Sequence, residues 1–160
     1  MSAVSAVPIR CLQNEEEAKL CARAMASSEP WLTLGSNYEH CLKAITDASR
    51  KAYVAVTTDP NQVSGLLVLN LIGPLRGYVQ MICVLPEFRN QGIGRQLLAF
   101  AERRIFCDYQ NVFLCVSSFN LSAQRLYERL GYTRVGKLDN YVVQGHDEIL
   151  MRKTIGPMKP

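Results

Sequence analysis

Two arginines and two glycines stand close together in the middle of the chain, at Arg89, Gly92, Gly94 and Arg95. Glycine lacks the side chain that would keep an anion away from backbone N–H groups, and the flanking arginines add positive charge. If a helix begins here, its first N–H groups have no partner inside the helix and lie at the positive end of its dipole. This spacing is typical of a cradle for phosphate groups, and a diphosphate suits it. The same glycines would also serve a tight turn that binds nothing.

The residues on either side of the glycines supply the strand and the helix that such a cradle needs. Tyr78–Val84 is a run of β-branched and apolar residues that suits a buried strand. Pro86 ends this strand because proline donates no backbone hydrogen bond. Apolar residues then recur at helical spacing, which predicts a helix from Gly92 to about Ile105.

Two common phosphate-binding motifs do not match this stretch. A dinucleotide fingerprint needs a further glycine or alanine three residues after Gly94, where this chain has Leu97. It also needs an acid at the end of the next strand, where the chain has Val116 and Ser117. The Gly-Lys-Ser/Thr of a P-loop is absent. Neither motif therefore accounts for the glycines.

The pattern Arg89-x-x-Gly92-x-Gly94 resembles the pyrophosphate-binding motif Q/R-x-x-G-x-G/A of the GCN5-related N-acetyltransferases, the GNAT family. Residues 120–132, NLSAQRLYERLGY, resemble the second signature of the same family. The two motifs stand in the family's order and extend from about Gly77 to Lys153. This resemblance implies an N-acetyltransferase that moves an acetyl group from acetyl-CoA directly to a primary amine.

The resemblance also implies an α+β fold of the GNAT type, formed by a single domain over residues 1–160 with a core at about 8–153. Such a fold has a mixed, mostly antiparallel sheet of about seven strands with a parallel, splayed pair, flanked by about four helices. The sequence predicts Gly65 as a bulge and Gly131 as a left-handed helix cap. The strands are predicted at residues 8–12, 52–57, 63–71, 78–84, 111–116, 132–138 and 148–153, and the helices at 15–25, after Asn37, at 92–105 and from Asn120 or Ser122.

The family's cofactor path can be carried over residue by residue. The resemblance assigns the backbone of Ile82, Cys83 and Val84 to the pantetheine and thioester, and a backbone N–H near Cys83 and Val84 to the developing oxyanion. Asn120 would hold the pantetheine or the adjoining end of the cofactor. The residues assigned to the diphosphate are Arg89, Asn90, Gln91, Gly92, Ile93, Gly94 and Arg95.

Tyr127 matches the tyrosine that the family uses as general acid toward the departing thiolate. Spacing alone would place it on the apolar face of its helix, and the match of the whole second signature favours the acid role. Relatives that acetylate the amino terminus of a ribosomal protein carry a glutamate base five residues before the asparagine, where this chain has Cys115. The base is left unassigned among a water chain, catalysis by proximity and desolvation, and the side chains of Glu29, His146, Asp147 and Glu148.

The acceptor site in this family lies between the first strand and the second helix. The resemblance therefore makes Glu29, Trp31, Tyr38 and Glu39 candidates for substrate contact, although Trp31 and Tyr38 would also serve as packing residues. Acidic and aromatic walls favour a small-molecule amine. Two alternatives stay open: transfer to a protein α-amine or lysine, and a non-catalytic acetyl-CoA-binding module that regulates a partner.

Composition and charge bear on which partners, metals and locations the protein can have. The net charge of +4 arises entirely after residue 80, where eleven basic residues face seven acidic ones, and this suits an acidic cofactor. Contiguous basic runs are lacking, so we expect no nucleic-acid partner. The six cysteines and two histidines lack zinc-ligand spacing, and no apolar run approaches the roughly 20 residues of a membrane span. We expect a cytoplasmic protein without a metal, as a monomer or homodimer.

Overall fold

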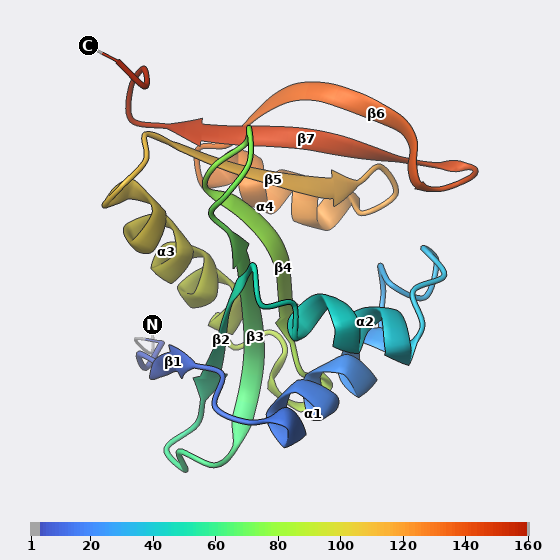
Figure 1. Ribbon diagram of the computed structural model, residues 1–160, viewed down its shortest axis with the longest axis vertical. Coiled ribbons are helices and arrows are strands. Elements are labelled where there is room, and N and C mark those ends of the chain that lie inside the picture. Colours follow the sequence, from blue (N-terminus) through green and yellow to red (C-terminus); the bar gives the residue numbers. More distant parts are fainter. Residues whose placement is uncertain (1–3, 160) are drawn as a thin grey trace.

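The computed structural model describes residues 4–159, which form a seven-stranded sheet with helices on both faces (Figure 1). The strand order is β1-β2-β3-β4-β5-β7-β6. All neighbours are antiparallel except β4 and β5, which run parallel. The predicted mixed, mostly antiparallel sheet with one parallel pair is therefore confirmed. The strands are β1 (Ile9–Cys11), β2 (Lys51–Val56), β3 (Val63–Asn70), β4 (Tyr78–Val84), β5 (Asn111–Ser117), β6 (Thr133–Val143) and β7 (His146–Thr154).

The described residues contain four α-helices, and asparagine side chains cap three of them, as predicted for Asn14 and Asn37 and as one of the two predicted starts, Asn120 or Ser122, for the last. Asn14 accepts a hydrogen bond from the N–H of Glu17, Asn37 from that of His40, and Asn120 from that of Ala123. Among residues 4–159, no helix is long and apolar enough to cross a membrane. The helices are α1 (Glu15–Ala26), α2 (Tyr38–Ile45), α3 (Ile93–Phe106) and α4 (Leu121–Arg129), and a short 3₁₀ turn, η1, spans Pro86–Phe88.

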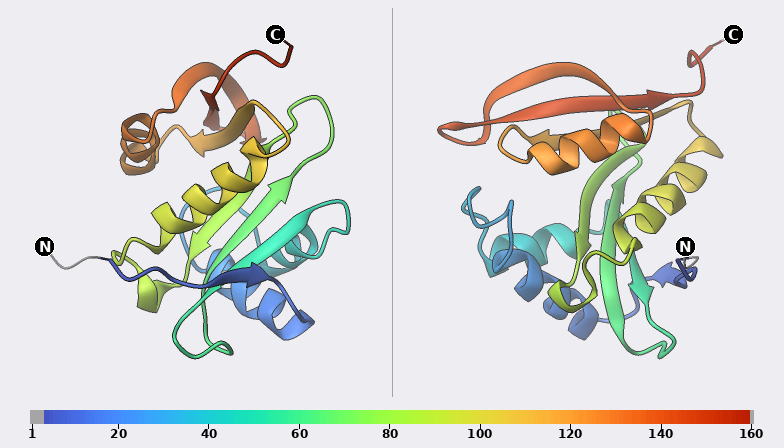
Figure 2. Two further views of the ribbon diagram at one scale, coloured as in Figure 1. Left: turned by 90° about the vertical axis from the view of Figure 1, so that its left-hand side faces the viewer. Right: turned by 180° about the vertical axis from the view of Figure 1, so that it is seen from behind.

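The sheet separates two hydrophobic cores. Figures 1 and 2 show α1 and α2 against one face and α3 against the other. Side chains alternate between the faces along each strand, so Leu66 of β3 joins the core under α1 and α2, whereas Leu67 joins the core under α3. β3 is buried on both faces, which explains why its sequence is continuously apolar. Tyr127 and Ala123 of α4 pack against the core under α3.

The C-terminal hairpin is longer than the sequence predicts. β6 reaches Val143 and β7 begins at His146, so the connection between the strands predicted at 132–138 and 148–153 shrinks to a two-residue turn at Gln144 and Gly145. Gly145 has a φ of +93°, as this type of tight turn requires. β6 is an edge strand whose residues are almost all exposed, so its sequence lacks the apolar pattern by which strands are recognised.

Gly65 is not the predicted bulge. It pairs with Ala55 of β2, and the irregularity in that pairing falls one residue earlier on β3, at Ser64. A Cβ atom at Gly65 would lie 2.9 Å from Cδ1 of Leu97 on α3. Close packing of α3 on β3 therefore explains the glycine. The left-handed cap at Gly131 is confirmed, with a φ of +96°.

We expect Gly77→Ala to lower the free energy of unfolding by about 2–4 kcal/mol, from backbone strain and overpacking together. Gly77 has a φ of +84°, and a Cβ atom there would clash with the carbonyl oxygen of Asn111 and lie 2.6 Å from Cγ2 of Ile105. Urea denaturation measures the change. Gly136→Ala is the matched control, because a Cβ at Gly136 meets nothing within 4 Å. A loss below about 1 kcal/mol for Gly77→Ala would contradict the packing described.

Candidate active site

β4 and β5 separate soon after they begin to pair. Their parallel register covers only Tyr78 with Phe113 and Val79 with Leu114. On the other side of β4, Leu69 pairs with Val79 and Val68 with Met81, which leaves Gln80 without a partner. Such a bulge bends its strand, and beyond it the two strands run in clearly different directions (Figure 1). The predicted splayed pair is confirmed.

The splay leaves part of the β4 backbone facing a gap. Leu85 donates its N–H to the carbonyl of Ser64 on β3 (3.0 Å). Because successive residues of a strand face opposite sides, Cys83 also faces β3, whereas Ile82 and Val84 face away from it. The Cys83 side chain lies in the core under α1 and α2, where burial raises the pKa of its thiol to about 11. The backbone groups directed toward the gap therefore belong to Ile82 and Val84.

The glycine turn has the geometry of an open helix N-terminus. Gly92 is the N-cap of α3 and has a φ of +77°, and Asn90 also has a positive φ, +60°. A Cβ atom at Gly94 would meet only Val84, at an ordinary contact distance of 3.6 Å. Protein packing therefore does not require a glycine at this position. Ile93 is 4% exposed, so of the predicted cradle residues it can offer only its backbone.

The two arginines of the turn differ in their contacts. Arg89 donates hydrogen bonds to the carbonyl of Val84 (3.2 Å) and to the hydroxyl of Ser28, which follows α1 (2.8 Å). Its guanidinium is thus engaged within the protein. Arg95 and Gln91 are exposed, and within residues 4–159 Arg95 forms no ion pair. Arg95 is therefore the free charge beside the turn.

Residues 4–7 lie beside the first turn of α3. The side chain of Gln96 accepts the N–H of Val7 (2.8 Å) and donates to the carbonyl of Ser5 (3.2 Å). A Cβ atom at Gly92 would lie 3.2 Å from Cγ1 of Val4. The space next to Gly92 is therefore bounded by this N-terminal segment.

α4 presents two of the predicted residues on one side of the gap. Asn120 accepts hydrogen bonds from the Ala123 N–H (3.2 Å) and the Ser122 hydroxyl (3.3 Å). Tyr127 is half-buried and packs edge-on against Tyr132, with ring centroids 5.9 Å apart. Burial raises the pKa of the Tyr127 phenol. Both Asn120 and Tyr127 line the pocket described next.

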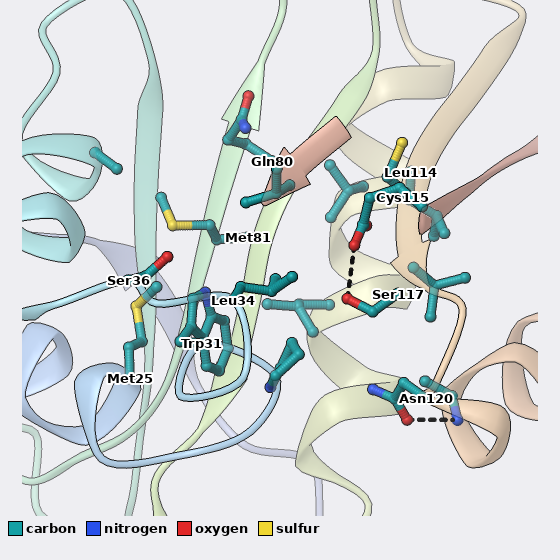
Figure 3. Close-up of a pocket in the computed structure, with 18 of the residues that line it drawn as sticks. Met25, Trp31, Leu34, Ser36, Gln80, Met81, Leu114, Cys115, Ser117 and Asn120 are labelled. Atoms are coloured by element: carbon teal, nitrogen blue, oxygen red, sulfur yellow. Dashed lines mark hydrogen bonds between the residues drawn. The ribbon is translucent and has the colours of Figure 1, made fainter. Parts of the chain in front are cut away.

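A pocket of about 290 Å³ lies where β4 and β5 diverge (Figure 3). In this view Trp31 and Leu34 of the α1–α2 connection lie on one side, and Cys115 and Ser117 of β5 lie on the other. The remaining walls come from α1, α2, β4, α4 and the β6–β7 hairpin. The residues that line it are Met25, Pro30, Trp31, Leu34, Ser36, His40, Cys41, Ala44, Tyr78, Val79, Gln80, Met81, Ile82, Leu114, Cys115, Val116, Ser117, Asn120, Ala123, Tyr127, Tyr141, Val142 and Glu148.

A buried carboxylate stands in the wall of this pocket. The antiparallel register of β5 and β7 places Ser117 opposite Glu148, and the Ser117 hydroxyl donates to Oε1 of Glu148 at 2.7 Å, one of the dashed lines in Figure 3. Glu148 is only 6% exposed. Burial raises the pKa of its carboxyl, and the hydrogen bond from Ser117 opposes that shift. The site therefore contains a carboxyl group whose pKa is displaced toward neutrality.

Cys115 lies on β5, five residues before Asn120, and its surroundings make it a weak base. Burial raises the pKa of its thiol, so the thiolate is disfavoured. Burial also raises the pKa of the neighbouring Tyr78, whose hydroxyl interacts with Cys115. Both groups are therefore neutral near pH 7. Among residues 4–159, no cluster of three or more His, Cys, Asp and Glu side chains could hold a metal ion.

The predicted acceptor residues are only partly brought together. Trp31 lines the pocket, whereas Glu29, Tyr38 and Glu39 are not among the lining residues. The carboxylate of Glu29 instead accepts hydrogen bonds from the N–H (3.2 Å) and hydroxyl (2.9 Å) of Thr33. Tyr38 packs against the core under α1 and α2. Their contact with substrate stays a prediction.

Several lining residues were not singled out by the sequence analysis, among them His40, Gln80, Ser117 and Tyr141. Of the suggested bases, the structure places Glu148 in the pocket wall and leaves His146 and Asp147 outside it. These residues carry no local motif. The register of β5 and β7 and the course of the hairpin bring Ser117, Tyr141 and Glu148 to the pocket, whereas His40 comes from α2 and Gln80 from β4.

Comparison with known proteins gives a family and a fold. The profile of the Acetyltransferase (GNAT) family matches residues 14–132. The chain is 34% identical over 82 residues to "N-alpha-acetyltransferase" of Saccharolobus solfataricus. The matched region covers 50% of this chain and about half, 49%, of that relative.

Two solved structures show the same fold at low sequence identity. One is the spermidine/spermine N-acetyltransferase SpeG from Vibrio cholerae, with a TM-score of 0.71 and 20% identity over 94% of each chain. The other is an aminoglycoside 6'-N-acetyltransferase complexed with coenzyme A, with a TM-score of 0.72 and 18% identity over 96% of this chain and 99% of that one. The names of these three proteins refer to three kinds of amine.

Proposed function

Because this chain belongs to the GNAT acetyltransferase family, we propose that it transfers the acetyl group of acetyl-CoA directly to a primary amine. The observation that carries the proposal is the bulge at Gln80. It opens β4 away from β5, so that β4 lines the pocket with residues 78–82 and then leads along the chain to the glycine turn. An extended ligand with a diphosphate at one end and a reactive group at the other suits that path.

The residues present fit acetyl-CoA. The backbone of Ile82 and the N–H of Val84 face the gap and can pair with an amide-containing arm, as an added strand would, whereas the Val84 carbonyl already accepts a hydrogen bond from Arg89. A side chain at Gly94 would meet no obstacle in the protein, so its absence leaves room for a diphosphate at the first N–H groups of α3. We assign the exposed Arg95 to the diphosphate, and Asn120 to the pantetheine end. Arg89 would reach the diphosphate only by leaving Ser28.

Tyr127 is the residue that we assign as general acid. When bound, acetyl-CoA supplies a thioester carbonyl as electrophile and a thiolate as leaving group. The half-buried phenol of Tyr127, whose pKa is raised, stays protonated at neutral pH and can give its proton to the sulfur. We assign the oxyanion to the N–H of Val84, which faces the gap, in preference to that of Cys83, which faces β3.

Two features bear on where the protein acts and on what. All six cysteines, which lie in the described part of the chain, are free thiols. This supports a reducing compartment such as the cytoplasm. The matched N-alpha-acetyltransferase favours a peptide α-amine as acceptor, whereas the small volume of the pocket favours a small amine, and the proposal covers both.

The test is thiol release from acetyl-CoA in the presence of amines, with calorimetric measurement of acetyl-CoA binding alongside. We expect binding together with thiol release for at least one class of primary amine. A panel of amino acids, alkylamines, polyamines, aminoglycosides and short peptides with free amino termini covers the acceptor classes. Tight binding without release for every amine would replace the enzyme by a non-catalytic acetyl-CoA-binding module.

A further inference from the structure

We propose that Glu148 holds and deprotonates the ammonium group of the acceptor, and that the acceptor is a singly charged amine attached to an apolar group. The inference rests on the proposed function and adds the missing base and the chemical class of the substrate. It follows from where the carboxylate is held and from what else lines the pocket.

The geometry of Glu148 suits a proton acceptor. β7 carries it into the pocket wall, and the hydrogen bond from Ser117 fixes one carboxylate oxygen, Oε1. Within residues 4–159, no lysine, arginine or histidine forms an ion pair with Glu148. A carboxylate that is 6% exposed and has no cation beside it gains a partner when an ammonium group binds.

The pocket wall limits the charge of the acceptor. Among the lining residues in the described part of the chain, Glu148 is the one carboxylate, and no lysine or arginine accompanies it. A polyamine or an aminoglycoside would bring further ammonium groups, each of which would lose water without gaining a charged partner. The other walls offer apolar surface for the body of the acceptor, from Met25, Trp31, Leu34, Met81 and Val142.

The proton steps balance with Glu148 and Tyr127 alone. Glu148 takes one proton from the ammonium, and the neutral nitrogen forms the new C–N bond to the thioester carbonyl carbon as the C–S bond breaks. Tyr127 gives its phenolic proton to the departing sulfur and recovers the second nitrogen proton. Glu148 then releases its proton to water. One amide, one free thiol and one proton result.

The discriminating variant is Glu148→Gln, which keeps the size of the side chain and removes the base. With hexylamine as acceptor at pH 7, we expect kcat/KM to fall by about 100-fold or more. For the wild-type protein, kcat/KM should be flat from above the pKa of the carboxyl up to that of the amine. For the variant it should rise about tenfold per pH unit, because only amine already neutral in solution can react. The affinity for acetyl-CoA should be unchanged.

Three further variants separate Glu148 from its surroundings. The other titratable groups of the pocket are Tyr78 on β4, Cys115 on β5, Tyr127 on α4, Tyr141 on β6 and, across the pocket, His40 and Cys41 on α2. Ser117→Ala should move the acid limb of the pH profile to higher pH, since the carboxylate loses the hydrogen bond that favours it. His40→Gln should keep the flat profile. Asp139→Asn, an exposed carboxylate beside Lys137, should leave kcat/KM unchanged.

The acceptor class is tested on the wild-type protein. We expect hexylamine, phenethylamine or a pentapeptide with a free amino terminus and an apolar first residue to exceed spermidine and kanamycin in kcat/KM by at least tenfold. Comparison of the two small amines with the pentapeptide shows whether the acceptor is a small amine or a peptide. Faster turnover of the polycations would overturn the inference and leave the proposed function standing. The inference would also be overturned if Glu148→Gln kept the wild-type kcat/KM, or if the tenfold rise per pH unit appeared in His40→Gln instead of in Glu148→Gln.

Discussion

Replacement of Gly92 by valine is expected to raise the dissociation constant of acetyl-CoA by at least about 100-fold. Gly92 has a φ of +77°, which costs a β-branched residue about 1–2 kcal/mol or more, so the turn will reorganise. The first N–H groups of α3 will then no longer converge on one anion. A hydrogen bond to a charged group contributes about 1.5–3 kcal/mol, so the loss of one or two accounts for the factor.

Calorimetric titration of the folded variant with acetyl-CoA measures this change. Gly73→Val is the matched control, because Gly73 has a φ of +85°, a Cβ there meets nothing within 4 Å, and the position does not line the candidate pocket. It imposes similar backbone strain without touching the cradle, so we expect a similar loss of stability and normal affinity. Normal affinity in Gly92→Val would remove the glycine turn from the cofactor site.

The parts of the fold that the sequence predicted well are those fixed by local signals. The bounds of β4, Tyr78–Val84, agree with the prediction because a dense apolar run ends at a proline. The helices that asparagines cap begin where predicted, because the cap chemistry involves only neighbouring residues. β6 was predicted too short, since an exposed edge strand need not alternate apolar and polar residues. The bulge was placed at Gly65 because glycine alone does not distinguish a bulge from close helix packing.

In the candidate site, too, the features that local signals fix could be predicted and those that depend on strand register could not. The glycine turn could be predicted because its residues are consecutive and their chemistry is local. The pairing of Ser117 with Glu148 joins positions 31 residues apart through the register of two strands, and no local pattern encodes a register. Gln80 is similar, since its unpaired state depends on how β3 and β4 align. Sequence reasoning therefore named Glu148 only as one candidate among several.

Replacement of Tyr127 by phenylalanine is expected to lower kcat by about 100-fold at saturating acetyl-CoA and amine. Phenylalanine keeps the ring that packs edge-on against Tyr132 and removes only the hydroxyl that would protonate the departing sulfur. The dissociation constant of acetyl-CoA should stay within about twofold of the wild-type value, since the hydroxyl acts only as the C–S bond breaks. Steady-state kinetics and calorimetry on the same preparation measure both quantities.

The alternative is that Tyr127 only packs α4 against the core, and Tyr132→Phe distinguishes the two roles. Tyr132 donates a hydrogen bond to Glu102 (3.0 Å) and contacts the same ring, but it does not line the pocket. Its replacement should lower stability and leave kcat near the wild-type value. If Tyr127→Phe instead lost affinity for acetyl-CoA at an unchanged kcat, Tyr127 would be a packing residue. The departing sulfur would then take its proton from water. If kcat falls at constant affinity in Tyr127→Phe but not in Tyr132→Phe, catalysis depends on the hydroxyl of Tyr127 itself, because each substitution removes one hydroxyl group and the two rings are in contact.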